Sequence, residues 1–333
     1  MRRRGFVAGL ATTAMWALGV HAQQRTKLKR VAMVHPTENV GNMTLAGRRF
    51  FRGIFEQLAA LGYVEGRNLL VERYSGQGVS DHYAELARDV VKTQPDVILS
   101  IGGQLTEPFK AATATIPIVT TSADPVFVGL VPSIARPGGN ITGVSVDAGL
   151  QIWGKRLEVL SEARPRLTNA RFLASRRSWD RVEGPAVREA AKQLRISLEG
   201  ALLASPIGPA AYRDVFGSMA QEQVDAIVVS TEAEHISNRA QIVGLAAEHR
   251  IAAIYPFREF TDAGGLLAYS VDLGETGRQL ANMIDKILKG AKPGDVPVLQ
   301  QVKFELIVNL RTAKALRLDI PAKLVARADE VIE

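Results

Sequence analysis

The sequence predicts an α/β protein made of two similar lobes, each a doubly wound parallel sheet covered by helices. Short apolar runs alternate with amphipathic helical stretches, a pattern typical of parallel strands that are buried on both faces. The same order of strands and helices then begins a second time. The chain has 333 residues, more than one hydrophobic core usually supports, so we expect two domains of ordinary size.

The first half begins with LKRVAMVHP, residues 28–36, which predicts a buried strand. A helix is expected from about Thr44, because the apolar residues after it keep helical spacing, and Gly62 provides its C-terminal cap. Two further helices are expected, one capped by Ser80 and one from Leu105 to Ala114. The remaining strands of this half are predicted at NLLVERY (68–74), DVILSIGG (96–103) and IPIVTTSADP (116–125).

The second half repeats this order. Strands are predicted at ARFLAS (170–175), ISLEGALL (196–203), DAIVVST (225–231) and IAAIYP (251–256). Helices are expected between them at 185–194, 210–221 and 236–249. PDVILSIGG followed by IPIVTTSADP is echoed by VDAIVVSTEAE followed by IAAIYPFREF, so we expect the halves to be structural copies.

Residues 1–22 are typical of a secretory signal peptide, with a basic start, an apolar run and Ala22 at an A-x-A-like cleavage site. The apolar run from Gly5 to Val20 has about 16 residues, fewer than the roughly 20 that span a bilayer. We therefore expect cleavage after Ala22 and a periplasmic location, rather than a retained anchor. The run RRGFV from Arg3 leaves both the general and the twin-arginine export routes open.

Composition excludes several classes of protein. The chain has no cysteine, hence no disulfide, no thiol nucleophile and no cysteine for lipid attachment. The net charge is +7, and removing the three arginines of the leader leaves 38 basic against 34 acidic residues, too mild a balance for a nucleic-acid partner. The five histidines form no metal-spaced pair, so we expect no metal site. We also expect that the protein needs no cofactor and is a monomer.

Ligands of open α/β sheets bind outside the carboxyl ends of the strands. In this chain the ends of the predicted strands of both halves carry polar side chains: Ser100, Thr120, Thr121, Ser122, Asp124, Ser175, Arg176, Ser230, Thr231 and Glu232. Each also has a structural interpretation. A Ser or Thr there can cap a helix, Asp124 before a proline can fix a turn, and Arg176 with Arg177 can be a solvated pair. Tyr255 can line a cleft or belong to the core, and His35, which ends the first strand, can contact a ligand.

Longer motifs resemble one family. The chain is similar to the ABC transporter substrate-binding protein family that includes tryptophan- and tyrosine-binding members, within the type I periplasmic binding protein fold. The similarity covers nearly all of the chain after the leader. It is carried by LAALGYVEGRNLLVERY, DVILSIGG, IPIVTTSADPVFVGLVPSIARPGGNITGV, KRLEVLSEARP, REFTDAGGLLAYSVD, DKILKGAKPGDVPV and FELIVNLRTAKALRLDIPAKLVARADEVI.

This resemblance implies two lobes joined by three hinge crossovers, a cleft that closes on a small solute, and delivery of that solute to an ABC permease in the inner membrane. Lobe 1 would comprise 28–145 and 272–298, and lobe 2 would comprise 146–271 and 299–333. ARPGGNITGV resembles the turn and strand that enter the first crossover, GGLLAYSVD would form the second, and the third would lie near 298–304.

By matching position, the loops 36–39, 103–104, 121–124 and 145–147 would face the ligand. With the strand-end residues, the candidate ligand-binding residues are His35, Thr37, Asn39, Gly103, Gln104, Thr121, Ser122, Asp124, Ser145, Asp147, Ser175, Arg176, Thr231, Glu232 and Tyr255.

The function expected from the resemblance is that of a periplasmic solute-binding component of an ABC importer. The family precedent suggests an aromatic amino acid, whose ammonium group would need an acid such as Asp124 or Glu232. A sensory domain that presents a solute to a membrane receptor stays open as an alternative. An enzyme on the same fold is disfavoured, because the chain has no G-x-G-x-x-G at its first strand-to-helix turn, no P-loop and no G-x-S-x-G elbow.

Overall fold

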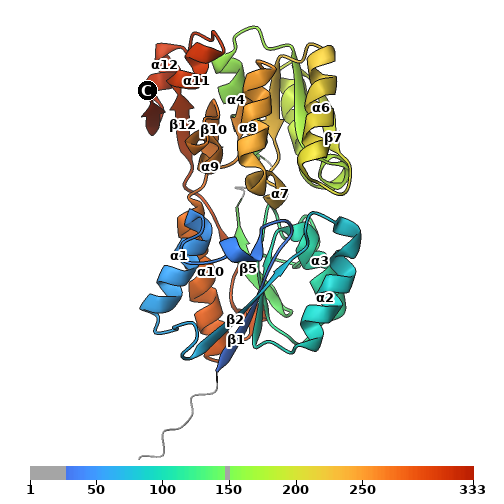
Figure 1. Cartoon of the computed structure of the whole chain (residues 1–333), viewed down its shortest axis with the longest axis vertical. Helices are drawn as coiled ribbons and strands as arrows, with labels where there is room; N and C mark the ends of the chain where they lie inside the picture. Colours follow the sequence, from blue (N-terminus) through green and yellow to red (C-terminus); the bar gives the residue numbers. More distant parts are fainter. Residues whose placement is uncertain (1–27, 147–150) are drawn as a thin grey trace, which may run out of the picture.

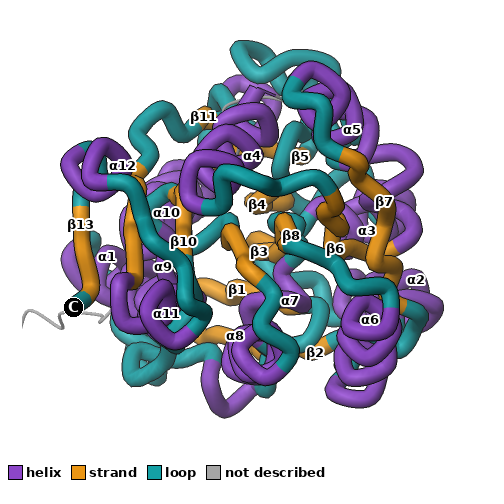
Figure 2. Tube along the Cα trace, turned by 90° about the horizontal axis from the view of Figure 1, so that it is seen from above, coloured by secondary structure: helices purple, strands orange, loops and turns teal. Residues whose placement is uncertain are grey.

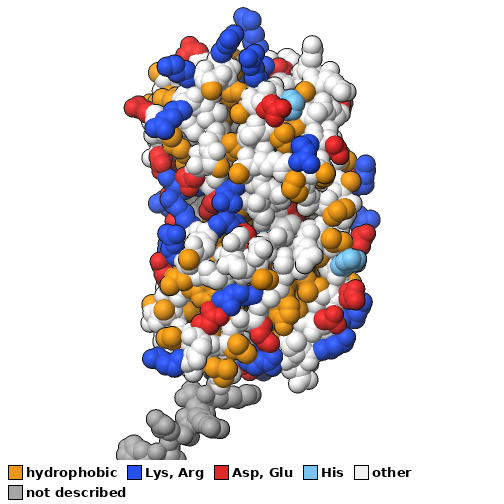
Figure 3. Space-filling model, viewed as in Figure 1, with side chains coloured by type: hydrophobic (Ala, Val, Ile, Leu, Met, Phe, Trp, Pro, Cys, Tyr) orange, Lys and Arg blue, Asp and Glu red, His pale blue; other side chains and the backbone are white. Residues whose placement is uncertain are grey.

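Two lobes stacked along the long axis form the molecule (Figure 1). The computed structural model describes residues 28–146 and 151–333. The predicted signal peptide, 1–22, and Asp147 therefore lie outside the described residues. On the face shown in Figure 3, basic and acidic side chains are interspersed over both lobes.

Lobe 1 contains a six-stranded sheet in the order β2-β1-β3-β4-β5-β11, with every neighbouring pair parallel. Helices α1 and α10 pack against each other on one face, and α2 and α3 cover the other. Its strands are β1 (Lys29–His35), β2 (Leu69–Ser75), β3 (Val97–Ile101), β4 (Ile118–Ser122), β5 (Ile141–Ser145) and β11 (Leu299–Gln300). Its helices are α1 (Arg49–Ala60), α2 (Tyr83–Lys92), α3 (Gly103–Ala112) and α10 (Leu273–Leu288), with short turns η1 (Val40–Asn42), η2 (Ser80–His82) and η4 (Pro293–Asp295).

Lobe 2 contains a seven-stranded sheet in the order β7-β6-β8-β9-β10-β12-β13. Its strands are β6 (Asn169–Ser175), β7 (Ser197–Leu203), β8 (Ala226–Val229), β9 (Ala252–Tyr255), β10 (Leu267–Ser270), β12 (Glu305–Asn309) and β13 (Glu330–Ile332). Its helices are α4 (Gln151–Ala163), α5 (Gly184–Gln193), α6 (Pro209–Gln221), α7 (Ala233–Ser237), α8 (Arg239–Glu248), α9 (Arg258–Asp262), α11 (Leu310–Ala315) and α12 (Ala322–Ala326), with a π-helical turn η3 (Ser178–Val182).

The first five strands of each lobe follow the same spatial order, second, first, third, fourth and fifth, which is the order of flavodoxin-like doubly wound sheets. The predicted fold class, two similar doubly wound lobes, is thus confirmed. One strand pair departs from parallel packing, β10 with β12. The reason is the path of the chain: β10 runs toward lobe 1, whereas β12 enters lobe 2 from lobe 1 and runs away from it.

Three connections join the lobes. The first leads from β5 to α4 and includes residues 147–150, which lie outside the described residues; the second leads from β10 to α10 and the third from β11 to β12. Leu299 and Gln300, which the prediction gave to lobe 2, pair with Val144 and Ser145 of lobe 1.

The turn 137–140 lies before β5, at the end of the strand opposite the crossover. Gly138 has a left-handed backbone (φ 72°), and Asn140 Nδ2 donates to the carbonyl oxygens of Thr113 and Ile116 at 3.0 and 2.9 Å. The turn therefore fixes the start of β5 rather than the hinge itself. Gly143 is needed within the strand, because a Cβ atom there would lie 1.9 Å from the carbonyl oxygen of Thr120.

Three predicted helices begin or divide differently in the structure. The helix expected from Thr44 begins at Arg49, and the helix expected at 236–249 is divided at Asn238 into α7 and α8. Ser80 does not cap a helix: it begins the turn η2, and α2 begins at Tyr83 with no side-chain cap. Figure 1 shows α7 at the boundary between the lobes, and Figure 2 shows it near the centre of the molecule seen from above. Within the part of the chain that is described, no helix has both the length and the apolar character to cross a bilayer.

Candidate functional site

A cavity lies between the lobes, where the carboxyl ends of the two sets of parallel strands face each other. Its empty space amounts to about 910 Å³, a figure that includes space open to solvent. Residues from the ends of β1, β3 and β4 and from the start of α3 form the lobe 1 wall. The lobe 2 wall comes from η3 and from the segment after β8.

The lobe 1 wall presents hydrogen-bond donors beside β4. Helix α3 begins after Gly102, which has no side chain to cap the first N–H groups of the helix and adopts φ 89°. Thr121 Oγ1 accepts the Gly102 N–H at 3.1 Å, so the threonine hydroxyl keeps its own hydrogen to donate. Ser122 is 4% exposed, and its hydroxyl has no partner among the described residues. A Cβ atom on Gly103 would lie 3.4 Å from Ser122 Oγ, so this hydroxyl sits beside the start of α3.

His35 and Arg48 form the part of the lobe 1 wall beside β1. The N–H groups of Thr37 and Glu38 donate to His35 Nδ1 at 3.1 and 2.9 Å. Burial, and next the positive charge of Arg48, hold the pKa of His35 well below its ordinary value, so the ring is neutral. Arg48 pairs with Glu38 and its guanidinium lies 5.3 Å from the centre of the Phe51 ring.

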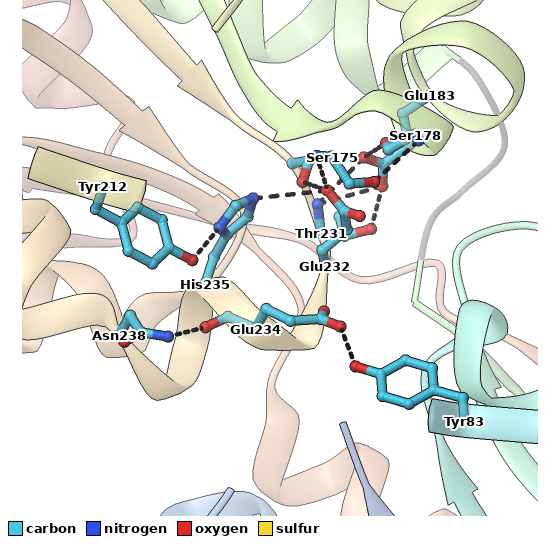
Figure 4. Close-up of polar contacts among 11 residues, drawn as sticks. Tyr83, Ser175, Ser178, Glu183, Tyr212, Thr231, Glu232, Glu234, His235 and Asn238 are labelled. Carbon is cyan, nitrogen blue, oxygen red and sulfur yellow. Dashed lines mark hydrogen bonds and ion pairs between the residues drawn. The ribbon is translucent and has the colours of Figure 1, made fainter. Parts of the chain in front are cut away.

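The lobe 2 wall presents three carboxylates, which Figure 4 shows with their hydrogen bonds. Glu183 is held by the Ser178 hydroxyl at 2.9 Å and by the N–H and hydroxyl of Thr231. Glu232 precedes α7, and its Oε2 accepts the Ser175 N–H at 2.8 Å and the Ser230 hydroxyl at 2.9 Å.

Glu234, the third carboxylate, belongs to α7 and is 4% exposed. Burial, and then the negative charge of Glu232, raise the pKa of Glu234 to about 7. Its Oε1 accepts the Tyr83 hydroxyl at 3.1 Å, and Tyr83 is a residue of lobe 1. The acid is therefore tied to the opposite lobe.

Other contacts also cross from lobe to lobe. The Ile207 N–H donates to the Gly78 carbonyl oxygen at 3.1 Å, and Thr37 Oγ1 donates to Ser237 Oγ at 3.0 Å. Arg177 of lobe 2 pairs with Glu107 on α3 of lobe 1. With the Tyr83–Glu234 bond, these contacts show that the described conformation is a closed one.

Seven predicted site residues line the cavity: His35, Gly103, Gln104, Thr121, Ser122, Thr231 and Glu232. Seven others do not. Thr37 bonds Ser237 across the lobes, Asn39 is exposed and accepts the Gly41 N–H, and Ser145 donates to the Ala123 carbonyl oxygen.

The remaining four predicted residues also lie outside the cavity lining. Two accept hydrogen bonds from backbone N–H groups, one is exposed, and one is buried in the core of lobe 2. Asp124 accepts the N–H groups of Val126 and Phe127 at 3.0 and 2.9 Å, so it fixes a turn. Ser175 Oγ accepts the Ser178 N–H at 3.1 Å at the start of η3, and Arg176 is exposed. Tyr255 is 1% exposed and stacks on Phe260 inside lobe 2.

Sequence reasoning missed Arg48, Glu183 and Glu234, which also line the cavity. Glu183 lies at the start of α5, a position where an acid usually serves a helix. Glu234 follows Glu232 by two residues, and the acid-rich run after β8 was the available signal for it. The described residues contain no group of three side chains able to hold a metal ion.

Comparisons with known proteins find relatives over most of the chain. Residues 46–332 match the family model of the ABC transporter substrate binding protein. A tyrosine-binding protein of Clostridioides difficile (strain R20291) is 24% identical over 269 residues, which cover 80% of this chain and 75% of that protein. A conserved domain protein of Vibrio cholerae has a TM-score of 0.80 and 24% identity, covering 92% of this chain and all of that one (100%). The ABC domain from Streptococcus pneumonia in complex with L-Trp has a TM-score of 0.78 and 22% identity, with the same coverage of 92% and 100%.

Proposed function

Because the chain belongs to the ABC transporter substrate-binding protein family, we propose that it binds an α-amino acid between its lobes and delivers it to the permease of an ABC importer. In this proposal the protein acts as a monomer in the periplasm. The observation that carries it is the polarity of the cavity: hydrogen-bond donors face it from lobe 1, and carboxylates face it from lobe 2.

The lobe 1 wall fits the carboxylate of an amino acid. The N–H groups at the start of α3 favour an anion, and the hydroxyls of Thr121 and Ser122 add two neutral donors. The unpartnered Ser122 hydroxyl supports this placement, because buried polar groups in proteins usually have a partner.

The lobe 2 wall fits the ammonium group. Glu183 and Glu232 are both held in place by hydrogen bonds from their own lobe, so each is oriented before a ligand arrives. An ammonium group needs such acceptors, and a carboxylate gives the stronger, charge-assisted bond.

The side chain of the ligand would lie among apolar residues. Phe50, Ile101 and Leu105 of lobe 1 and Val182 and Phe257 of lobe 2 line the cavity. Relatives named for tyrosine and solved with L-Trp support an aromatic side chain. Contacts with both lobes form together only in the closed form, so the ligand shifts the population toward closure.

Thermal-shift measurements followed by calorimetry test the proposal. L-Tyrosine, L-tryptophan and L-phenylalanine are compared with tyramine, which lacks the carboxylate, and with N-acetyl-L-tyrosine, which lacks the ammonium group. We expect at least one of the three amino acids to raise the melting temperature, and we expect both analogues to bind more weakly than L-tyrosine. If no amino acid raises the melting temperature, or if tyramine binds as tightly as L-tyrosine, the proposal is wrong.

A further inference from the structure

We propose that His35 is a specificity-determining residue, which donates its Nε2–H to an oxygen atom at the far end of the ligand's side chain. This inference rests on the proposed amino-acid site and names a feature of its ligand. The chemistry that fits is an aromatic side chain with an uncharged oxygen opposite its backbone end, such as a phenol.

The hydrogen bonds of the loop after β1 fix the tautomer of His35. Its Nδ1 accepts two N–H groups, those of Thr37 and Glu38, and an atom that accepts cannot carry the proton. A neutral imidazole with an unprotonated Nδ1 carries its hydrogen on Nε2. The only polar group that His35 can offer to the cavity is therefore an N–H donor.

The register of the lobe 1 sheet separates this donor from the carboxylate site. Val34 pairs with Ser100, and Ile101 pairs with Thr121, so His35, Ile101 and Thr121 occupy the same level of β1, β3 and β4. Two strand spacings, roughly 10 Å, lie between the first and the last. Donors thus stand at both ends of this wall with the apolar Ile101 between them, which suits a ligand with polar ends and an apolar middle.

The charges around His35 favour a neutral oxygen over a second carboxylate. Arg48 is paired with Glu38, whose carboxylate offsets the charge of the guanidinium beside His35. The His35 Nε2–H also cannot pair with the indole N–H of a tryptophan side chain, because both groups are hydrogen-bond donors.

The variant His35→Asn separates the two roles of the residue. Asparagine Oδ1 can accept the N–H groups two and three residues later, as Nδ1 does, so the loop keeps its bonds. The Nε2–H donor is lost. Calorimetry is run on the wild-type protein and on the variant with L-tyrosine, L-phenylalanine, L-tryptophan and 4-amino-L-phenylalanine, whose amine is a poor acceptor of nearly the same size.

In the wild-type protein we expect L-tyrosine to bind about 2- to 10-fold more tightly than L-phenylalanine or 4-amino-L-phenylalanine, the effect of one hydrogen bond. In His35→Asn we expect the preference for L-tyrosine over L-phenylalanine to disappear, whatever change the two affinities share. A cooperative urea-unfolding transition shows that the variant is folded. If the variant does not fold, the order of the ligands in the wild-type protein decides.

Two results would overturn the inference and leave the proposed function intact. One is equal weakening of L-tyrosine and L-phenylalanine in His35→Asn, since His35 would then contact the part common to both ligands. The other is wild-type binding of L-phenylalanine, 4-amino-L-phenylalanine or L-tryptophan at least as tight as that of L-tyrosine. If none of the four amino acids binds the wild-type protein, the proposed function fails first, and the inference falls with it.

Discussion

The hydrogen bond between Tyr83 and Glu234 crosses the lobes, so Tyr83→Phe should weaken ligand binding. Both side chains are buried, and the donor and acceptor are 3.1 Å apart. Losing a buried hydrogen bond costs about 0.5–1.5 kcal/mol, or about 1.5–3 kcal/mol where the acceptor is charged. If the unliganded protein is mostly open, the loss falls on the closed form alone. A range of about 1–3 kcal/mol then corresponds to roughly 5- to 150-fold weaker affinity.

Tyr212→Phe is the matched control. Its hydroxyl is buried and hydrogen-bonded to His235 Nδ1 at 2.8 Å, but both residues belong to lobe 2. This variant should lose about 0.5–1.5 kcal/mol of unfolding free energy and keep its affinity, because its bond lies within one lobe. Calorimetry with the amino acid found in the thermal-shift screen gives both affinities, and urea unfolding gives both stabilities. Equal affinity of Tyr83→Phe and the wild-type protein, or equal weakening by Tyr212→Phe, would show that the Tyr83–Glu234 bond does not stabilise the closed form.

Four further variants test other contacts. The pKa of Glu234 is raised from 4.5 to about 7, so this group contributes stability that is fully present below pH 4.5 and is lost as the pH rises through about 7. Glu234→Gln should therefore raise the unfolding free energy at pH 8 by roughly 1–3 kcal/mol, and the unfolding free energy should change less between pH 4.5 and 7 than in the wild-type protein, both measured by urea unfolding. Ser122→Ala should weaken L-phenylalanine binding about 2- to 10-fold in calorimetry and leave the melting temperature nearly unchanged, because its hydroxyl has no partner to lose. Asp124→Ala should cost about 1–2 kcal/mol of unfolding free energy and leave affinity unchanged in the same two assays, because its carboxylate holds a turn. Gly143→Ala should cost more than about 4 kcal/mol in urea unfolding, because its Cβ would overlap the Thr120 carbonyl oxygen.

The fold could be predicted from the sequence because each strand is a continuous apolar run. The third and fourth strands of the two halves also resemble each other, and β3 and β4 occupy the same places in their sheet as β8 and β9 do in theirs. The antiparallel pairing of β12 was not predicted. It depends on the direction in which the chain returns from lobe 1, which no local pattern records.

The site could be predicted in part, for a similar reason. Thr121 and Ser122 end β4, and Thr231 and Glu232 lie just after β8, so their place at the carboxyl edge was predictable from periodicity. Asp124 follows a strand as well, but its carboxylate is used by two backbone N–H groups, a choice that depends on the local turn.

The residues that were missed reach the cavity through tertiary structure. Arg48 lies at the N-cap of α1, next to the exposed Arg49, and a sequence pattern cannot tell which of the two arginines turns inward. Glu234 becomes part of the site because α7 lies at the lobe boundary, where Tyr83 of the other lobe reaches it.

Small-angle X-ray scattering of the wild-type protein, without and with a saturating amino acid, shows whether the two lobes close on the solute. We expect the unliganded protein to have the larger radius of gyration and the ligand to reduce it to the value calculated from the closed structure. A radius of gyration that stays the same when calorimetry shows the site to be full would contradict the claim that the solute is held by closure of the two lobes.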